Sequence, residues 1–326
     1  MSQHSHSNVW RAAADLAQAG ARGALATVAR TRGSTPVPAG TKMLVGSEGR
    51  LIGTVGGGCV EADVIGAALE AQRSGTPLIQ SHRLNADLAG DIGLSCGGTV
   101  EVFVEPLVRD ERYVRVLERA AAAESGIVRT GTTWPDGPVK TFESLGVEAA
   151  AGAPATLSRD RRFVIERLAP APRVVVFGAG HVGSAIALAA HAAGFRVVVV
   201  DDRADFADAA RFPAGVRVEA AAADGAVARI GIGQGDAVVV ATRGHRQDAA
   251  VVELVAVSQA GYVGLLGSRR KKAVLTKGLV AAGVPRAALE RVRVPVGLAI
   301  GAVTPEEIAV SVVAELIAWR RATAPA

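Results

Sequence analysis

Cysteine, aromatic residues and long hydrophobic runs are scarce in this chain of 326 residues, and each scarcity excludes a class of protein. Its 2 cysteines are too few for a disulfide framework, so we expect reduced thiols. No uninterrupted apolar run is long enough to span a bilayer, and the N-terminal segment lacks the pattern of a signal peptide. The sequence therefore predicts a cytoplasmic protein with no membrane partner.

Aromatic residues make up 4% of the chain, which leaves few platforms on which nucleobases could stack. The net charge of +5 would suit nucleic acid, but the arginines are scattered along the chain instead of forming patches. The one dense basic cluster is "SRRKK" at residues 268–272, which suits a solvated helix start and an anion site equally well. We expect no nucleic-acid partner.

Hydrophobic residues make up 49% of the chain and charged residues 21%, which is typical of a globular protein. The length suits two domains of ordinary size. The stiff segment "LAPAP" at residues 168–172 has the composition of a connector. We place the boundary near Ala169, which gives an N-terminal domain over residues 1–168 and a C-terminal domain over residues 169–326.

The C-terminal domain alternates buried strands with helices. "VVVF" starting at Val174 is followed by a glycine-rich turn, a helical run and the strand "FRVVVVDDR". Further strands are expected at residues 216–220, 236–242, 261–267 and 291–295. A helix that starts with a threonine cap is expected at "TPEEIAVSVVAELIAWRR". This order is typical of an α/β fold, here a Rossmann-like, doubly wound parallel sheet.

The N-terminal domain is less regular. Strands are expected at "GALATVAR", "TKMLVG", "RLIGTVG" and "TVEVFVEPL", with helices near residues 9–19, 60–73 and 112–124. A hairpin is expected around "WPDG" at residues 134–137, whose Pro, Asp and Gly suit a tight turn. We expect an α/β domain with a mixed sheet.

The motif "VVVFGAGHVG" at residues 174–183 places Gly178, Gly180 and Gly183 between a strand and a helix, with Asp201 at the end of the next strand. Such glycines let a pyrophosphate approach the backbone at a helix N-terminus, and the acid can bind ribose hydroxyls. His181 would lie in the same turn. The motif predicts a phosphorylated ligand such as a nucleotide, but it is equally compatible with a Rossmann fold that has no nicotinamide chemistry.

Two more segments follow predicted strands of this domain, where open α/β sheets place ligands. "ATRGHRQD" brings His245 and Asp248 to that edge, and "GSRRK" brings Ser268, Arg269 and Arg270. A loop histidine bonded to backbone is the plain alternative for His245.

The first cysteine lies in "TVGGGCVEA", directly before a predicted helix. A helix N-terminus lowers the pKa of a thiol toward the reactive thiolate, and glycines let a ligand approach closely. Free cysteine is also a common small core residue, so both interpretations stay open. The candidates here, with the second cysteine in "GLSCGGTVEV", are Gly56, Gly57, Gly58, Cys59, Glu61 and Cys96.

The loop "RGSTPVPAGTKMLV" holds hydroxyls and two prolines between two predicted strands. Rigid loops with hydroxyls bind polar ligands, and they also form plain turns. Ser34 and Thr35 are candidates in this loop, and Lys42 would reach back to it from the next strand.

Seven segments together resemble the XdhC/CoxI family, the xanthine dehydrogenase accessory proteins: "GSTPVPAGTKMLV", "GTVGGGCVEADV", "FGAGHVG", "DDR", "RFP", "YVGLLGSRRK" and "PVGLAIGAVTPEEIAVSVVAEL". The resemblance covers nearly the whole chain, except for residues 125–162. It implies a molybdenum cofactor (molybdopterin) chaperone and not an enzyme. Such a protein holds the cofactor while a cysteine desulfurase supplies the sulfido ligand, and delivers it to apo xanthine dehydrogenase or a related molybdenum hydroxylase.

The resemblance also implies that the candidate residues of both domains contact this cofactor, with Cys59 as a contact to molybdenum or as the carrier of a transient persulfide. Two other functions remain open: an NAD(P)-dependent oxidoreductase that uses the Rossmann site, and a scaffold that never touches the cofactor. A homodimer is a further expectation. The sequence leaves open which domain holds the pterin.

Overall fold

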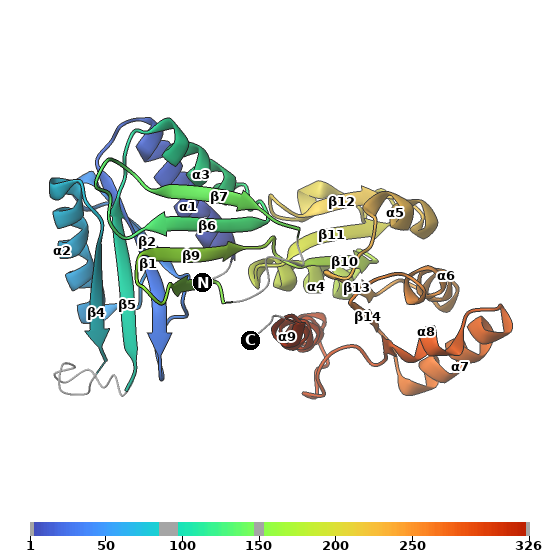
Figure 1. Ribbon diagram of the computed structural model, residues 1–326. Coiled ribbons are helices and arrows are strands. Elements are labelled where there is room, and N and C mark those ends of the chain that lie inside the picture. The colour runs from blue at the N-terminus through green and yellow to red at the C-terminus, as the bar shows by residue number, and fades with distance from the viewer. Residues whose placement is uncertain (1–2, 85–96, 147–152, 324–326) are drawn as a thin grey trace. The chain divides into compact units, whose positions relative to one another are not determined.

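The computed structural model describes residues 3–84, 97–146 and 153–323, without the side chains of residues 3–7, 48, 59 and 323 (Figure 1). The chain divides into two compact units, residues 1–170 and residues 171–324. The connector expected near Ala169 lies at this division.

The first sheet of the N-terminal unit has the strand order β3-β2-β1-β5-β4. Its strands are β1 (Gly23–Arg32), β2 (Lys42–Gly46), β3 (Leu51–Gly53), β4 (Leu78–Arg83) and β5 (Thr99–Pro106). Side chains alternate between its two faces. Helix α2 (Gly58–Ser74) packs on one face against Ala26 and Val102, whereas α1 (Gln3–Gln18) and α3 (Glu111–Ala121) pack on the other against Leu25 and Leu44 (Figure 1).

A second sheet, with the order β7-β6-β9-β8, covers the remaining part of that second face. Its strands are β6 (Gly126–Gly131), β7 (Lys140–Ser144), β8 (Ala155–Leu157) and β9 (Phe163–Leu168). Strands β6 and β7 flank the expected "WPDG" turn, so that hairpin is confirmed. Strands β8 and β9 were not expected, because they are short and follow a segment of small residues.

The fold class is confirmed in both units, with one difference in the first. All strand pairings described in the N-terminal unit are antiparallel, where the sequence had suggested a mixed sheet. Helices α2 and α3 each join two strands that are not neighbours in a sheet. Such long connections look the same in sequence whether the strands they join run parallel or antiparallel.

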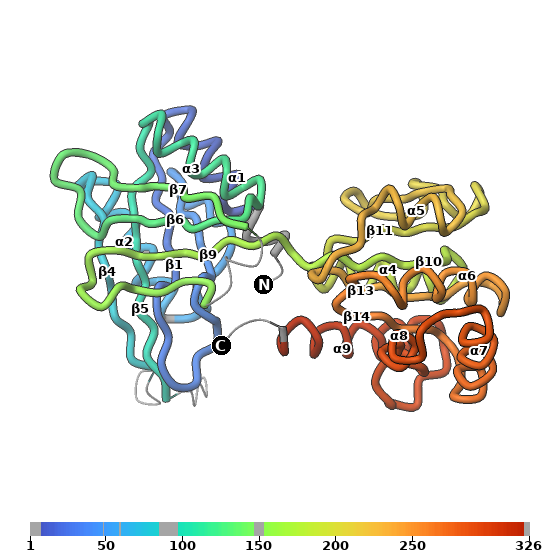
Figure 2. The backbone as a smooth tube through the Cα atoms, turned by 45° about the vertical axis from the view of Figure 1, so that its right-hand side comes forward, coloured from blue at the N-terminus to red at the C-terminus, as the bar shows by residue number. Residues whose placement is uncertain are grey.

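The C-terminal unit is a six-stranded parallel sheet in the order β12-β11-β10-β13-β14-β15, which is the Rossmann order. Figure 2 shows β11, β10, β13 and β14 side by side in this order. Its strands are β10 (Arg173–Phe177), β11 (Arg196–Asp201), β12 (Arg217–Ala220), β13 (Asp236–Val240), β14 (Tyr262–Leu265) and β15 (Val292–Arg293). The expected strand pattern is confirmed.

Helices cover both faces of this parallel sheet. On one face α4 (His181–Ala192) and α9 (Pro305–Thr323) pack around Val174 and Val176, and on the other α5 (Ala223–Ile230) and α6 (His245–Ala256) pack around Val175. The helices α7 (Arg269–Ala281) and α8 (Arg286–Glu290) join β14 to β15. Helix α9 begins with the expected cap, in which the Glu307 amide donates to the Thr304 hydroxyl.

Four buried charges lie between the two sheets of the N-terminal unit. The Lys42 ammonium pairs with Glu166 and donates to the Thr27 hydroxyl at 2.7 Å. The Lys140 ammonium lies 2.5 Å from a Glu105 oxygen, and both of these side chains are almost fully buried. Burial lowers the pKa of Lys42, although its Glu166 partner opposes that shift.

The Tyr113 hydroxyl donates to the second Glu105 oxygen at 3.1 Å, and the Trp10 ring lies 4.2 Å from the Lys42 ammonium. Burial, then the neighbouring Glu105, raises the pKa of Tyr113 well above its usual value, so this phenol is a permanent donor. Lys42 was expected to reach back to the Ser34 loop. That prediction is wrong, because its side chain points between the sheets and is 1% exposed.

We predict that Glu166→Met lowers the free energy of unfolding by about 3–5 kcal/mol, because it leaves the Lys42 ammonium buried without a carboxylate. Urea unfolding followed by circular dichroism measures this loss. The matched double variant Lys42→Met/Glu166→Met removes both charges and should lose distinctly less. A double variant as unstable as the sum of its two singles would contradict the coupling.

Candidate functional site

Three glycine-rich segments meet at one end of the five-stranded sheet, where β1 and β3 end and β5 begins. They are the loop at residues 33–41, the loop at residues 54–58, and Gly97 with Gly98. A β-carbon added at Gly56 would lie 3.4 Å from Pro36, and one added at Gly98 would lie 2.2 Å from the Ser34 carbonyl oxygen. The structure therefore brings together motifs that are far apart in the sequence.

The loop at residues 54–58 forms an open backbone cradle. Gly56, Gly57 and Gly58 have φ values of +133°, +76° and +61°, which only glycine adopts readily. A β-carbon at Gly57 or Gly58 would meet nothing within 4 Å among the described residues, so close packing does not explain these glycines. Helix α2 starts here without a side-chain cap, which leaves its first amides and positive dipole end available to an anion.

Two polar side chains hold the cradle in shape. The Thr54 hydroxyl donates to a Glu61 carboxylate oxygen, and the Gly56 amide donates to the Thr54 hydroxyl at 3.2 Å. Glu61 lies in the first turn of α2, where a carboxylate is favoured by the helix dipole. Glu61 was expected to contact a ligand, and the contact that the structure shows is this support of the loop.

The two cysteines are placed by their chain neighbours only. Cys59 is the second residue of α2, directly after the glycine cradle, and its side chain lies outside what the structure describes. Cys96 lies in residues 85–96, which the structure does not describe. The Leu84 amide donates to the Gly98 carbonyl at 2.9 Å, so both flanks of that segment lie at the same end of the sheet.

The hydroxyls of the neighbouring loop differ in availability. The Thr35 hydroxyl donates to the Val37 carbonyl at 3.0 Å and so stabilises the turn. Ser34 is exposed, and its hydroxyl has no partner in the part of the chain that the structure describes. Ser34 therefore remains a candidate for a polar ligand, whereas Thr35 has a local role.

In the C-terminal unit, two of the three motif glycines are closely packed and the third is open. A β-carbon at Gly178 would lie 2.3 Å from the Ala241 carbonyl oxygen, and one at Gly183 would lie 1.8 Å from the Gly178 carbonyl oxygen. These two glycines are required by packing. Gly180, the N-cap of α4, would carry a β-carbon with nothing within 4 Å among the described residues, so its backbone is open to a ligand.

Asp201, the expected ribose-binding acid, is already engaged. Its carboxylate accepts the Ala179 amide at 2.8 Å and the Arg203 guanidinium at 2.9 and 3.0 Å. Burial alone would raise the pKa of Asp201, but the Arg203 and Ala179 hydrogen bonds outweigh it and lower the pKa to about 2. A ribose could reach this carboxylate only by displacing Arg203, whose guanidinium also stacks on Phe206 at 3.5 Å.

His181 and His245 both lie exposed at the starts of helices that follow β10 and β13, neighbouring strands where the strand order reverses. Open α/β sheets bind ligands at this point. The N-caps of both helices, Gly180 and Gly244, give no side-chain cap. His245 was expected near the start of a helix and is its first residue.

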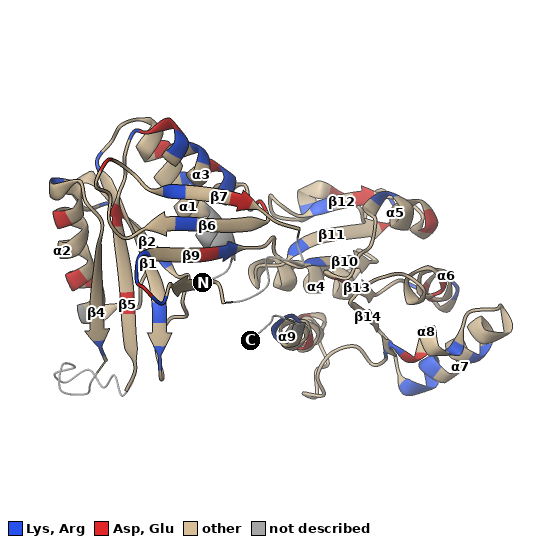
Figure 3. Cartoon of the chain, in the orientation of Figure 1, with Lys and Arg blue, Asp and Glu red and all other residues tan. Residues whose placement is uncertain are grey.

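Three other candidates of this edge have structural roles or face elsewhere. Asp248 is 1% exposed, accepts the Thr242 hydroxyl at 2.7 Å and lies 2.6 Å from the Lys271 ammonium. Ser268 caps α7 by accepting the Lys271 amide. Arg269 lines a hollow between α7 and α8, in the basic stretch visible in Figure 3, and not the edge at which β10 and β13 end.

Sequence reasoning missed a pocket of arginines on the five-stranded sheet. It is lined by Arg30, Arg32, Ser81, Arg83, Thr99, Glu101 and Arg161. These residues come from three strands and a distant turn, so no single stretch of sequence gathers them. The available signal was the spacing of two in "ARTRG" and "SHR", because it places Arg30 with Arg32, and Ser81 with Arg83, on one face of each strand.

The described residues show neither a metal cluster nor a membrane-spanning helix. They contain no group of three or more His, Cys, Asp or Glu side chains that could hold a metal ion. None of their helices is long and apolar enough to cross a membrane.

We predict that Asp201→Asn lowers the free energy of unfolding by about 1–2 kcal/mol at neutral pH. Because the folded-state pKa is depressed, this contribution is present above the ordinary value of 3.8 and is lost as the pH falls toward about 2. Denaturant unfolding of both proteins from pH 7 to pH 2 measures it. Asp202→Asn is the control, since Asp202 is exposed; an equal loss at pH 2 and pH 7 would contradict the assignment.

The chain is similar to known proteins along both units. It matches the XdhC and CoxI family over residues 16–82 and the XdhC Rossmann domain over residues 174–316. A Bacillus subtilis (strain 168) protein, named as a probable component of xanthine dehydrogenase, is 31% identical over 323 residues, which cover 92% of this chain and 94% of that one.

Two more distant similarities agree. The Escherichia coli (strain K12) protein named "Molybdenum cofactor insertion chaperone PaoD" is 25% identical, covering 97% of this chain and 89% of that one. A Bacillus halodurans crystal structure, titled as that of a xanthine dehydrogenase, has a TM-score of 0.77 at 24% identity and covers 99% of this chain and 97% of its own; it shows the same fold. With a relative 31% identical over nearly its whole length, the chain belongs to the XdhC and CoxI family, as its motifs had indicated.

Proposed function

We propose that this protein is a molybdenum cofactor chaperone and not itself an enzyme. It holds the cofactor while a cysteine desulfurase supplies the terminal sulfido ligand, and then delivers it to apo xanthine dehydrogenase or a related molybdenum hydroxylase. The observation that carries this proposal is the open glycine cradle at the uncapped start of α2, directly before Cys59. The relative named as a cofactor insertion chaperone supports the general role.

The residues at this end of the sheet fit the chemistry of such a cargo. The cofactor combines a phosphate, a polar pterin and a molybdenum atom held by sulfur. Free backbone amides in a positive-φ loop suit its anionic oxygens, and the Ser34 hydroxyl suits a polar ring. A cysteine after the cradle suits a soft metal or sulfur centre. We therefore assign the cargo to the N-terminal unit.

The oxidoreductase alternative has less support. A nicotinamide dinucleotide would need the Asp201 carboxylate for its ribose, and that carboxylate is engaged by Ala179 and Arg203. The open space at Gly180 still suits a phosphorylated ligand, so a nucleotide at this motif remains part of the proposal. A cytoplasmic location and a homodimer also remain expectations, and a pure scaffold is the outcome if no cofactor binds.

We predict that the purified protein binds molybdenum cofactor stoichiometrically under anaerobic conditions and slows its oxidation. Cofactor released from a molybdenum enzyme is mixed with the protein and passed through gel filtration. The bound pterin is then measured by fluorescence after acid oxidation. Absence of co-elution would overturn the chaperone proposal, and substrate-dependent oxidation of NAD(P)H would favour the oxidoreductase instead.

We predict that Cys59→Ser folds normally but binds the cofactor at least about tenfold more weakly, or delivers it without activating the dehydrogenase. Serine nearly preserves the volume of cysteine while removing the soft sulfur. The fluorescence assay and reconstitution of the apoenzyme measure the two steps. Cys96→Ser is the matched variant and should show a milder loss. If Cys59→Ser binds the cofactor fully and activates the dehydrogenase fully, Cys59 has no role in cofactor handling and the interpretation as a small core residue stands.

A further inference from the structure

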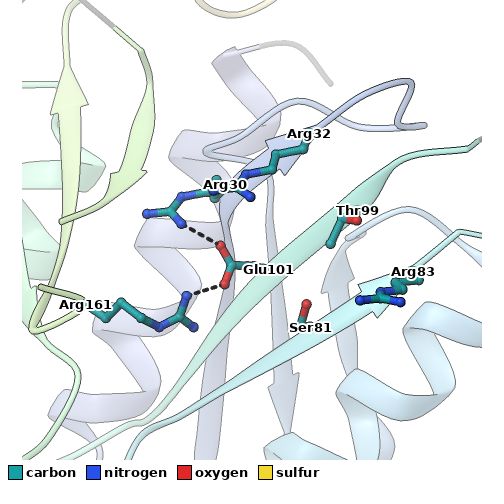
Figure 4. Close-up of a pocket in the computed structure, with 7 residues that line it drawn as sticks. All are labelled: Arg30, Arg32, Ser81, Arg83, Thr99, Glu101 and Arg161. Atoms are coloured by element: carbon teal, nitrogen blue, oxygen red, sulfur yellow. Dashed lines mark hydrogen bonds and ion pairs between the residues drawn. The ribbon is translucent and has the colours of Figure 1, made fainter. Parts of the chain in front are cut away.

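The arginine pocket, lined by Arg30, Arg32, Ser81, Arg83, Thr99, Glu101 and Arg161, has a volume of about 250 Å³ (Figure 4). It lies on the face of the five-stranded sheet opposite α2, next to the loop that carries Ser34. Four guanidinium groups, one carboxylate and two hydroxyls line it, so every lining residue is polar or charged. Its composition is that of an anion site.

Strand register arranges the pocket in two rows. In the first row Glu101 of β5 lies opposite Arg30 of β1 and Ser81 of β4. Glu101 is bridged by Arg30 at 3.1 Å and by Arg161 at 2.6 Å, and Figure 4 shows both arginines pointing at it from two sides. One carboxylate therefore holds two guanidinium groups in place and still leaves this row with a net positive charge.

The second row has no carboxylate. Thr99 of β5 lies between Arg32 of β1 and Arg83 of β4, its register partners on either side. Neither guanidinium group has a hydrogen bond or ion pair among the residues that the structure describes. Side chains directly opposite one another on neighbouring strands are about 5 Å apart, so both guanidinium groups can reach a ligand above Thr99. Arg32 and Arg83 are two strand spacings apart, about 10 Å, so an anion above Thr99 would lie between their two guanidinium groups.

Arg161 reaches the pocket from the other sheet, out of the turn between β8 and β9. It has a φ of +60°, a conformation that residues other than glycine rarely adopt. The turn is held by its neighbours, since the Asp160 carboxylate accepts the Ser158 hydroxyl at 2.6 Å and the Thr132 hydroxyl donates to the Arg161 carbonyl at 2.8 Å. Strained backbone of this kind gathers at ligand sites.

We propose that this arginine pocket is a subsite for a phosphate group, the phosphomonoester end of the cargo whose remainder lies at the glycine cradle. The inference rests on the proposed function for the identity of that cargo. A dianionic phosphate accepts paired hydrogen bonds from Arg32 and Arg83, which a planar guanidinium supplies better than an ammonium. Pockets for whole ligands measure roughly 300–1,000 Å³, so a pocket of about 250 Å³ suits one end of a ligand.

The test uses the full chain and the double variant Arg32→Gln/Arg83→Gln. Calorimetric titration with inorganic phosphate and with glycerol 3-phosphate at low ionic strength measures the pocket by itself. We expect the double variant to weaken both by about 100-fold or more, because it removes two charged donors and each charge-assisted hydrogen bond contributes about tenfold or more to the affinity. The matched control is Arg22→Gln, an exposed arginine just before the other end of β1, which should change affinity less than about twofold. An unchanged phosphate affinity in the double variant would overturn the proposal that this pocket binds phosphate.

A second measurement separates this proposal from the chaperone proposal. Released cofactor is compared with the same cofactor after phosphatase treatment. The wild-type protein should prefer the phosphorylated form by about tenfold or more, and the double variant should bind both forms equally. If the wild type binds both forms equally, the phosphate-subsite proposal is overturned and the chaperone proposal stands. If the wild type binds neither form of the cofactor, but the double variant still has a lower affinity for inorganic phosphate, the chaperone proposal fails. The pocket is then an anion site for another ligand.

Discussion

The pairing of two lysines with two glutamates between the sheets of the N-terminal unit is the constraint on which the rest of that unit depends. Each charge is costly to bury alone, and each is compensated by one partner on the opposing sheet. Lys42 and Glu105 belong to the first sheet, whereas Glu166 and Lys140 belong to the second. A shift of either sheet by one residue would separate both pairs and bury four unpaired charges.

This constraint also positions the arginine pocket. Glu101 and Glu105 lie on the same face of β5, because side chains two or four residues apart on a strand share a face. Glu105 forms an ion pair with Lys140 of the second sheet, and Glu101 forms one with Arg161 from the turn just before β9. Strand β9 is fixed in turn by Glu166 and Lys42. The same register that satisfies the buried charges thus sets Arg161 over Glu101 and opens the pocket beside it.

The sequence was most informative where a local pattern decides the structure. The strand–helix alternation of the C-terminal unit, the cap at Thr304 and the "WPDG" hairpin all depend on residues close in the chain, and all three are confirmed. The sequence predicted that Lys42 reaches back to the Ser34 loop. That prediction is wrong because the ammonium pairs instead with Glu166, which lies far along the chain on the other sheet. The arginine pocket was invisible for the same reason, since its four arginines come from three separate segments.

The two units differ in how a ligand could be held, and this bears on the kind of function each suits. In the C-terminal unit the carboxylate that would recognise a ribose is saturated by its own chain, so a dinucleotide would have to break Arg203 away from Asp201. In the N-terminal unit the amides of Gly57 and Gly58 and the guanidinium groups of Arg32 and Arg83 have no hydrogen-bond partner among the described residues, so a ligand there breaks no hydrogen bond of the protein on entering or leaving. The affinity of such a site comes from exposed backbone amides and surface charges. Salt or a competing partner protein weakens the binding of a ligand to these groups. A protein that must give up its cargo needs this kind of site, whereas an enzyme gains from an enclosed one.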